Sequence, residues 1–187
     1  MILRSLIIAT AVFLCSVGTA QADFYLSANY GTAKLELDTV SVKRADAFKV
    51  TGGYRFNNDF SVDVAYLSTD DLNVDPHDAN NLDQLNGKMN FNGMVYSAAY
   101  HIMNPEESRL YMFVRASIYD FDAELTDLDT NTTTTESSAG LGWGLGIGFF
   151  IIDGLAFAFE LESYAETKTL RERENLTLLS GLLVYHF

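Results

Sequence analysis

The chain has 187 residues with 25 acidic and 12 basic side chains, which gives a net charge of −13 at neutral pH. Such a chain offers no basic stripe to meet phosphate groups, so nucleic acid is excluded as a partner. Its length suits one domain, and an aromatic content of 13% argues against disorder.

The N-terminus has the pattern of a cleavable export signal. Arg4 provides a positive start, residues 6–14 form an apolar run, and residues 20–22 offer a small-x-small cleavage site. An N-terminal membrane anchor is the alternative, but the apolar run is short for a membrane span. We therefore expect a signal peptide over 1–22 and one mature domain over 23–187. The only cysteine lies in the first segment, which excludes disulfides and cysteine metal sites from the mature domain.

After this signal the sequence falls into eight stretches in which apolar side chains alternate with polar or small ones. This period of two is typical of β-strands with one apolar face. The stretches cover residues 24–30, 48–56, 60–66, 93–102, 110–119, 139–149, 155–162 and 179–187. Their lengths suit strands that cross a membrane at a tilt.

The sixth stretch permits two interpretations. Glycine occupies every even position from Gly140 to Gly148, which places the side-chain bulk on one face of a strand. Gly140, Gly144 and Gly148 also have the small-xxx-small spacing of a packed membrane helix. The strand is favoured because the other seven stretches offer a helix no partner. We then expect the glycines to face inward and to leave room for Arg115 and Glu160 on the neighbouring strands.

The connections between the stretches alternate in length. Three are short and rich in turn-forming residues, at 57–59, 104–108 and 152–154. Four are long and polar, at 32–46, 68–90, 119–138 and 165–174. Outward aromatic residues gather at the short-turn ends, as in the belt of a membrane interface: Phe24, Phe56, Phe60, Tyr100, Phe149, Phe157, Tyr185 and Phe187. Short turns on one side and long loops on the other are typical of outer membrane barrels.

Residues 61–66, the glycine ladder and the terminal residues 181–187 carry a family resemblance. On these, residues 23–187 resemble the eight-stranded outer membrane barrels of the OmpA-type transmembrane domain and opacity-protein class. The resemblance implies an all-β fold, an eight-stranded antiparallel up-and-down transmembrane β-barrel. It also implies that Tyr185 and Phe187 serve as the signal for the outer membrane assembly machinery. Gly181 departs from that signal, because it stands six positions before the final aromatic residue instead of five.

Six charged residues fall on the inward faces of the predicted strands: Lys49, Arg55, Asp63, Arg115, Glu160 and Glu162. An eight-stranded barrel encloses little more than its own side chains, and buried charges are costly unless they are paired. We therefore expect these three cations and three anions to pair and to plug the interior. A proton path or a catalytic site is the alternative for the same residues.

The remaining acidic residues concentrate in two of the four predicted outer loops. The acidic residues that we expect to form this surface are Asp70, Asp71, Asp75 and Asp78 in the loop 68–90, and Asp120, Asp122, Asp127 and Asp129 in the loop 119–138. Such loops keep neighbouring molecules apart, bridge to lipopolysaccharide through divalent cations, or attract a basic partner. The spacing of Asp127, Asp129 and Asn131 starts like a calcium loop, but Thr132 replaces the required glycine. We expect no metal site and no cofactor.

An enzymatic role on outer-leaflet lipid would need a nucleophile, a base and an orienting group within reach. Ser97 and His101 share a strand face but lie roughly 13 Å apart along it. We therefore expect no enzyme, but a bacterial outer membrane protein with a structural or surface-interaction role, surrounded by lipid and lipopolysaccharide. The alternatives are an adhesin, host-factor-binding or resistance barrel and, less favoured, a lipid A-modifying enzyme or a narrow pore.

Overall fold

The computed structural model describes residues 23–36, 44–57, 59–74, 87–102, 109–168 and 173–187. The predicted signal peptide over 1–22 lies outside the described residues, and so do Asp75 and Asp78. None of the described residues forms a helix long and apolar enough to cross a membrane.

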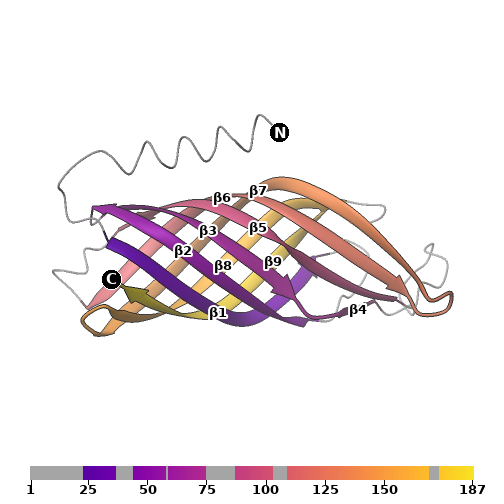
Figure 1. Ribbon diagram of the computed structural model, residues 1–187, viewed down its shortest axis with the longest axis horizontal. Coiled ribbons are helices and arrows are strands. Elements are labelled where there is room, and N and C mark those ends of the chain that lie inside the picture. Colours follow the sequence, from indigo (N-terminus) through magenta and orange to yellow (C-terminus); the bar gives the residue numbers. More distant parts are fainter. Residues whose placement is uncertain (1–22, 37–43, 58, 75–86, 103–108, 169–172) are drawn as a thin grey trace.

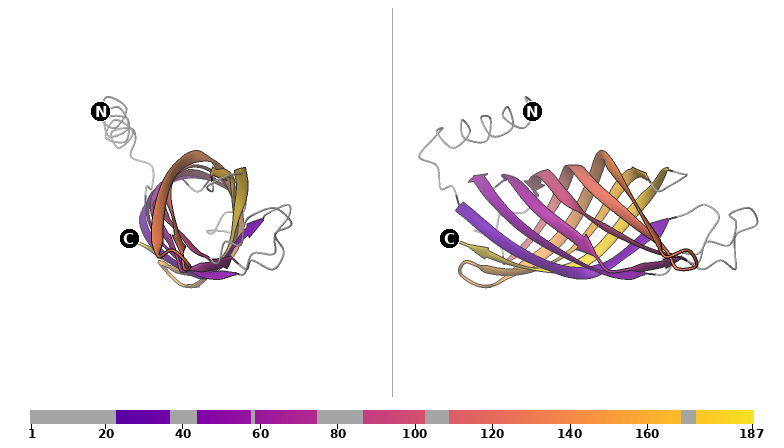
Figure 2. Two further views of the ribbon diagram at one scale, coloured as in Figure 1. Left: turned by 90° about the vertical axis from the view of Figure 1, so that its right-hand side faces the viewer. Right: turned by 45° about the vertical axis from the view of Figure 1, so that its right-hand side comes forward.

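The described residues form nine strands joined into one closed antiparallel sheet (Figures 1 and 2). They are β1 (Asp23–Glu36), β2 (Ala45–Asn57), β3 (Phe60–Thr69), β4 (Leu72–Val74), β5 (Gly87–His101), β6 (Leu110–Asp127), β7 (Thr132–Ile152), β8 (Leu155–Lys168) and β9 (Arg173–His186). The short β4 and β3 both pair with β5, and β4 lies in line with β3. Counted as one, they make the barrel wall eight-stranded. This confirms the eight-stranded up-and-down barrel, with the glycine ladder inside β7.

The barrel closes with a stagger that can be followed through the strand pairs. Ala33 on β1 pairs with Leu178, and the chain of paired residues continues through Glu162, Gly144, Arg115, Ala99, Ser61 and Arg55. Arg55 then pairs with Asp23, which lies on β1 again but far from Ala33. A stagger of this kind tilts the strands against the barrel axis, as closure of a sheet requires.

The predicted outer loop 119–138 is in large part strand, and strands also extend into the predicted loop 68–90. The segment predicted as a loop over 119–138 is a hairpin, in which β6 runs to Asp127 and β7 begins at Thr132. Asp120 and Asp122, predicted as loop residues, therefore lie on β6. The physical reason is that the alternation of buried and exposed residues continues. Phe121 is buried between the exposed Asp120 and Asp122, and Leu125 is buried next to the exposed Glu124. Likewise, β5 begins at Gly87, inside the segment predicted as a loop over 68–90.

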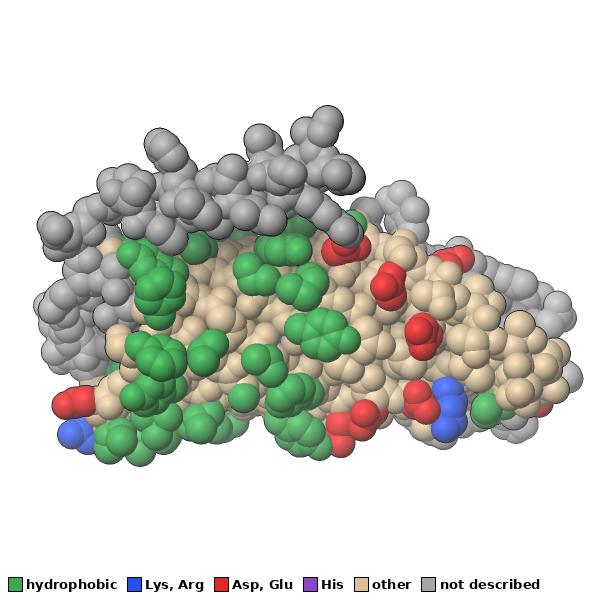
Figure 3. Space-filling model, in the orientation of Figure 1, with side chains coloured by type: hydrophobic (Ala, Val, Ile, Leu, Met, Phe, Trp, Pro, Cys, Tyr) green, Lys and Arg blue, Asp and Glu red, His purple; other side chains and the backbone are tan. Residues whose placement is uncertain are grey.

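The outer surface of the barrel has an apolar band and an acidic region beyond it (Figure 3). Six of the eight aromatic residues predicted for the short-turn belt are well exposed and the other two, Phe56 and Phe157, partly so. Tyr30 and Tyr66 close the band toward the long-loop end, because the next outward residues on their strands are Thr32 and Ser68. Two aromatic limits with an apolar zone between them match the two interfaces of a membrane.

The inward glycines of β7 make room mainly for aromatic rings. A Cβ atom on Gly142 would lie 2.7 Å from Cδ1 of Tyr164, and one on Gly140 would lie 2.6 Å from the hydroxyl of Tyr119. At Gly144 the nearest side-chain atom is Cγ of Glu162 at 3.1 Å, followed by Cβ of Arg115 at 3.6 Å. Arg115 is therefore among the side chains nearest to Gly144, as expected, and Glu160 is the cross-strand partner of Gly146. The prediction missed the rings, whose positions depend on the register between strands.

Candidate functional site

Both faces of β6 change character at the same level of the barrel. From Leu110 to Ile118 the outward residues are apolar, but the next outward residue is Asp120. On the inward face, Arg115 and Ser117 are polar, but the next inward residue is Tyr119. Below this level the outward face of β6 therefore suits lipid. Above it, β6 has a polar outer face and an apolar inner face, as in a water-soluble barrel. The interior consequently divides into a charged cluster and an apolar plug.

The charged cluster consists of Lys49, Asp63, Arg115, Glu160 and Glu162, and each of these side chains is buried. Arg115 lies between two carboxylates, with Nη1 at 2.8 Å from Oδ1 of Asp63 and Nε at 2.9 Å from Oε1 of Glu160. Lys49 Nζ lies 3.0 Å from Oε2 of Glu160 and also contacts Oε2 of Glu162. Five of the six predicted interior charges are therefore joined in one continuous chain of ion pairs.

Neutral donors complete the coordination of the three carboxylates. The hydroxyl of Tyr25 donates to Asp63 at 2.8 Å, Nδ2 of Asn29 donates to Glu160 at 3.1 Å, and the hydroxyl of Tyr164 donates to Glu162 at 3.0 Å. Buried ion pairs are tolerated only when such additional hydrogen bonds satisfy the remaining lone pairs. Tyr25, Asn29 and Tyr164 were not predicted as site residues, because their partners follow from the strand register.

The apolar plug fills the interior between the charged cluster and the long-loop end. Its buried members are Ala33, Leu35, Ala45, Ala47, Ala65, Leu67, Leu72, Met89, Phe91, Val95, Tyr119, Phe121, Ala123, Leu125, Tyr164, Leu176 and Leu178. The rings of Tyr119 and Phe121 stack with centroids 4.6 Å apart, and Tyr164 meets both edge-on. A packed apolar interior offers water and ions no polar partners.

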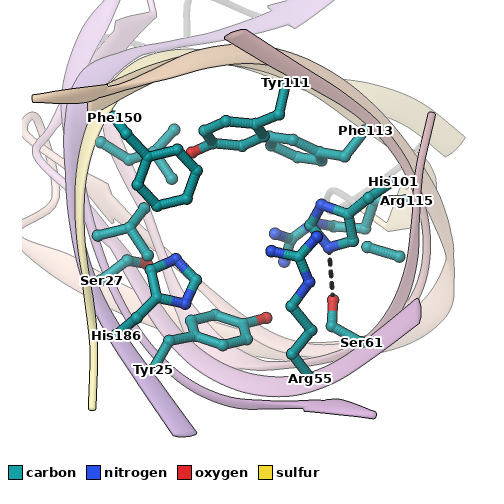
Figure 4. Close-up of a pocket in the computed structure, with 13 residues that line it drawn as sticks. Tyr25, Ser27, Arg55, Ser61, His101, Tyr111, Phe113, Arg115, Phe150 and His186 are labelled. Atoms are coloured by element: carbon teal, nitrogen blue, oxygen red, sulfur yellow. Dashed lines mark hydrogen bonds between the residues drawn. The ribbon is translucent and has the colours of Figure 1, made fainter. Parts of the chain in front are cut away.

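Arg55, the sixth predicted interior charge, lines a pocket at the short-turn end (Figure 4). Aromatic side chains, including Tyr111, Phe113 and Phe150, form one side of this pocket, and Arg55, Arg115 and His101 lie on another. The guanidinium of Arg115 also lies 5.6 Å from the ring centre of Phe113. Within the pocket, two cationic side chains, Arg55 and Arg115, therefore face an aromatic wall.

A serine–histidine pair lies in the same pocket, but its serine is Ser61 and not Ser97, the one that the strand pattern places on the face of His101. Ser61 Oγ lies 3.1 Å from Nε2 of His101, whereas Ser97 accepts a hydrogen bond from Ser117 at 3.1 Å. A catalytic histidine needs a third group that orients its other nitrogen. No described residue forms a hydrogen bond with Nδ1 of His101. Among the described residues, the Ser61–His101 pair therefore has no third member that orients the imidazole.

The predicted acidic residues that the structure describes all lie on the outer surface toward the long-loop end. Asp70 and Asp71 stand between β3 and β4, and Asp71 pairs with Lys88 at 3.2 Å. Asp127 shapes the β6–β7 turn, because its Oδ1 accepts hydrogen bonds from the backbone N–H groups of Asp129 at 2.8 Å and Thr130 at 3.3 Å. The bond from Asp129 lowers the pKa of Asp127 below its ordinary value. Within the described ranges, no three His, Cys, Asp or Glu side chains are grouped to hold a metal ion.

Tyr185 and Phe187, the predicted assembly signal, face outward at the short-turn end. Their rings meet edge-on with centroids 5.0 Å apart, and the backbone N–H of Phe187 donates to the carbonyl of Phe24 at 2.9 Å. The last residue is therefore held against the first strand, at the seam where β1 and β9 close the barrel.

The family described as "Outer membrane protein beta-barrel domain" matches residues 7–187. Among solved structures, the surface protein NspA of Neisseria is similar with a TM-score of 0.72 and 17% identity, covering 89% of this chain and 99% of that one. OprG of Pseudomonas aeruginosa has a TM-score of 0.63 and 12% identity, with 91% and 99% covered. Ail of Yersinia pestis has a TM-score of 0.58 and 16% identity, with 89% and 99% covered. No curated protein sequence matches the chain significantly.

Proposed function

Because the chain belongs to the outer membrane protein β-barrel family, we propose that it acts in the bacterial outer membrane through its exposed surface, with a sealed interior. The change of character on both faces of β6 carries this proposal. Below Ile118 the wall suits lipid, and above it the outward acids meet water while the interior turns apolar. The described part of the barrel beyond the proposed membrane level is therefore a folded platform of strands.

The sealed interior is supported by two successive barriers. Lys49 and Arg115 are each held by two carboxylates, so moving either cation out of the path would leave buried charges uncompensated. The apolar plug then lies between this cluster and the long-loop end. We expect purified protein in planar bilayers to give no steady single-channel current. Steady, large channels would overturn the sealed interior.

A surface role can be tested by shortening the platform while keeping the membrane section. Replacing residues 121–137 by a two-residue turn removes the β6–β7 hairpin above Asp120 and leaves the apolar band and the charged cluster intact. Cells that carry this variant should lose binding of the partner surface, whereas its heat-modifiable gel migration should be unchanged. Unchanged binding together with an altered envelope would favour a structural role instead.

An adhesin or host-factor-binding barrel is the second candidate, and the charge of the platform restricts its ligand. Ail of Yersinia pestis was crystallised with the heparin analogue sucrose octasulfate. In the present chain the wall above the band carries Asp120, Asp122 and Glu124, which would repel a polysulfate. We therefore propose a cationic ligand, or divalent cations that bridge to lipopolysaccharide. Calorimetry with sucrose octasulfate should give no binding heat.

We also propose that the chain is not an enzyme. The Ser61–His101 pair lies at the short-turn end, which faces the periplasm in the proposed orientation and is remote from outer-leaflet lipid. A change in lipid A mass on overexpression, lost in Ser61→Ala, would overturn this proposal.

A further inference from the structure

One part of the barrel wall has an open edge. β7 pairs with β6 along its whole outer half, as far as Thr132 opposite Asp127. Its pairing with β8, however, begins only at Gly142 opposite Tyr164. Beyond Tyr164, β8 passes through an irregularity and continues to pair with β9. Residues 132–141 of β7 therefore have a neighbour on one side only among the described strands.

This edge lacks the devices that usually protect an exposed strand. Natural edge strands carry lysine, proline or bulges, because unpaired N–H and C=O groups invite another strand. Residues 132–141 contain no lysine and no proline, and Glu136 is their only charge. The register between β6 and β7 runs without a bulge, and four successive threonines, starting at Thr132, favour the extended conformation. The edge is therefore free of bulges, has a sequence that favours strand, and lacks protective lysine or proline.

The outward face beside the edge carries regularly spaced negative charges. Asp120, Asp122 and Glu124 alternate along β6 and point outward. Their partners across the hairpin are Ala139, Ser137 and Thr135, which are small and exposed. Ser137 donates a hydrogen bond to Asp122 at 2.5 Å, and no lysine or arginine occurs between Arg115 and Lys168. A strand added to β7 would lie about 4.8 Å from it, so long basic side chains could extend over the small residues to the acids.

We propose that residues 132–141 bind an extended peptide segment of a partner as an additional antiparallel strand, with lysine or arginine at every second position. Backbone pairing would supply affinity, and the alternating charges would set the register, as in other cases of strand addition. A second copy of this chain is a poorer occupant, because edge-to-edge pairing would bring two acidic hairpins together. The inference rests on the proposed surface role and specifies the chemistry of its partner.

The test uses the purified full-length protein in nanodiscs and fluorescent peptides, with anisotropy as the measurement. A peptide of alternating lysine and threonine is compared with a block peptide of the same composition, which has equal charge. We expect the alternating peptide to bind at least about tenfold more tightly. Two further isomers carry backbone N-methyl groups at odd or at even positions. Only one of them should bind, because an antiparallel strand pairs through alternate residues.

Protein variants test the acidic register. The triple variant D120N/D122N/E124Q should weaken the alternating peptide about tenfold or more. The charge-matched control D46N/D70N/D71N, elsewhere on the acidic surface, should change affinity by less than about twofold. Equal binding of alternating and block peptides, or of both N-methyl isomers, would overturn strand addition. If the shortened hairpin abolishes cell binding while the peptides fail to discriminate, the surface role stands and only this inference fails.

Discussion

Adding one methyl group at Gly142 is expected to destabilise the barrel, although alanine is a better strand residue than glycine. The new Cβ would lie 2.7 Å from Cδ1 of Tyr164 and 3.1 Å from the backbone oxygen of Ser163. Tyr164 cannot move aside cheaply, because it is 1% exposed, packs edge-on against Tyr119, and donates its hydroxyl to Glu162. The methyl group therefore forces either the ring or the neighbouring strand to shift.

The expected loss of unfolding free energy follows from a comparison with a matched substitution at Gly52. A Cβ there would meet only Cδ2 of Leu26, at 3.6 Å, which is ordinary van der Waals contact. Both substitutions gain about 0.5–1 kcal/mol from the reduced freedom of the unfolded chain. Overpacking of a filled interior costs about 1–3 kcal/mol. Gly52→Ala should therefore be neutral or slightly stabilising, and Gly142→Ala should be less stable than Gly52→Ala by about 1–3 kcal/mol.

The assay is reversible urea unfolding in lipid bilayers, followed by tyrosine and tryptophan fluorescence and by heat-modifiable gel migration. The comparison uses the difference between the two variants, so the uncertain unfolded state in the bilayer largely cancels. Equal unfolding free energies for Gly142→Ala and Gly52→Ala would refute the reasoning that the glycines provide clearance for rings.

Three further predictions concern the interior, the strand and the turn. Glu160→Gln should cost about 3–5 kcal/mol in the same assay, because Lys49 and Arg115 would lose a shared buried partner, whereas exposed Glu124→Gln should stay within about 0.5 kcal/mol. Gly144→Leu should reduce the folded fraction on gels, because a Cβ there already approaches Cγ of Glu162 to 3.1 Å, whereas the outward Leu145→Val should fold normally. The hydrogen bond to ionised Asp127 lowers the pKa of that carboxyl in the folded turn. The amide of Asp129 should therefore be protected from hydrogen exchange at pH values above the ordinary pKa of aspartate. This protection should be lost as the pH falls through the lower pKa that Asp127 has in the folded protein. Asp127→Ala should abolish this pH dependence, and an unchanged profile would contradict the assignment.

The eight strands could be predicted because membrane strands carry their apolar residues outward with a period of two. The same rule concealed the β6–β7 hairpin. Above Ile118 the alternation persists through Tyr119, Phe121 and Leu125, but its polarity is inverted, with acids outward. A segment rich in aspartate and threonine was therefore predicted as a loop, although its period was that of a strand.

The partners inside the barrel could be predicted only as a group. Charge balance and burial placed six residues in the interior, but the pairing of Arg115 with Asp63 joins strands that are not adjacent in the sheet. The position of Arg55 in the same pocket as His101 also depends on the stagger of the closed sheet. Sequence periodicity fixes which face a side chain takes, but not the level at which strands meet.

The apolar plug gives this membrane protein a thermal property of water-soluble proteins. Lipid-facing side chains of the band remain in an apolar medium when the barrel forms, so they contribute little to the heat capacity of unfolding from within a bilayer. Part of the plug, including Phe121 and Leu125, lies in the section beyond the apolar band. These side chains become hydrated when that section opens, which raises the heat capacity of unfolding. The outer section should consequently weaken on cooling, while the membrane section keeps its hydrogen-bonded wall. Temperature can thus separate the two sections of one continuous sheet.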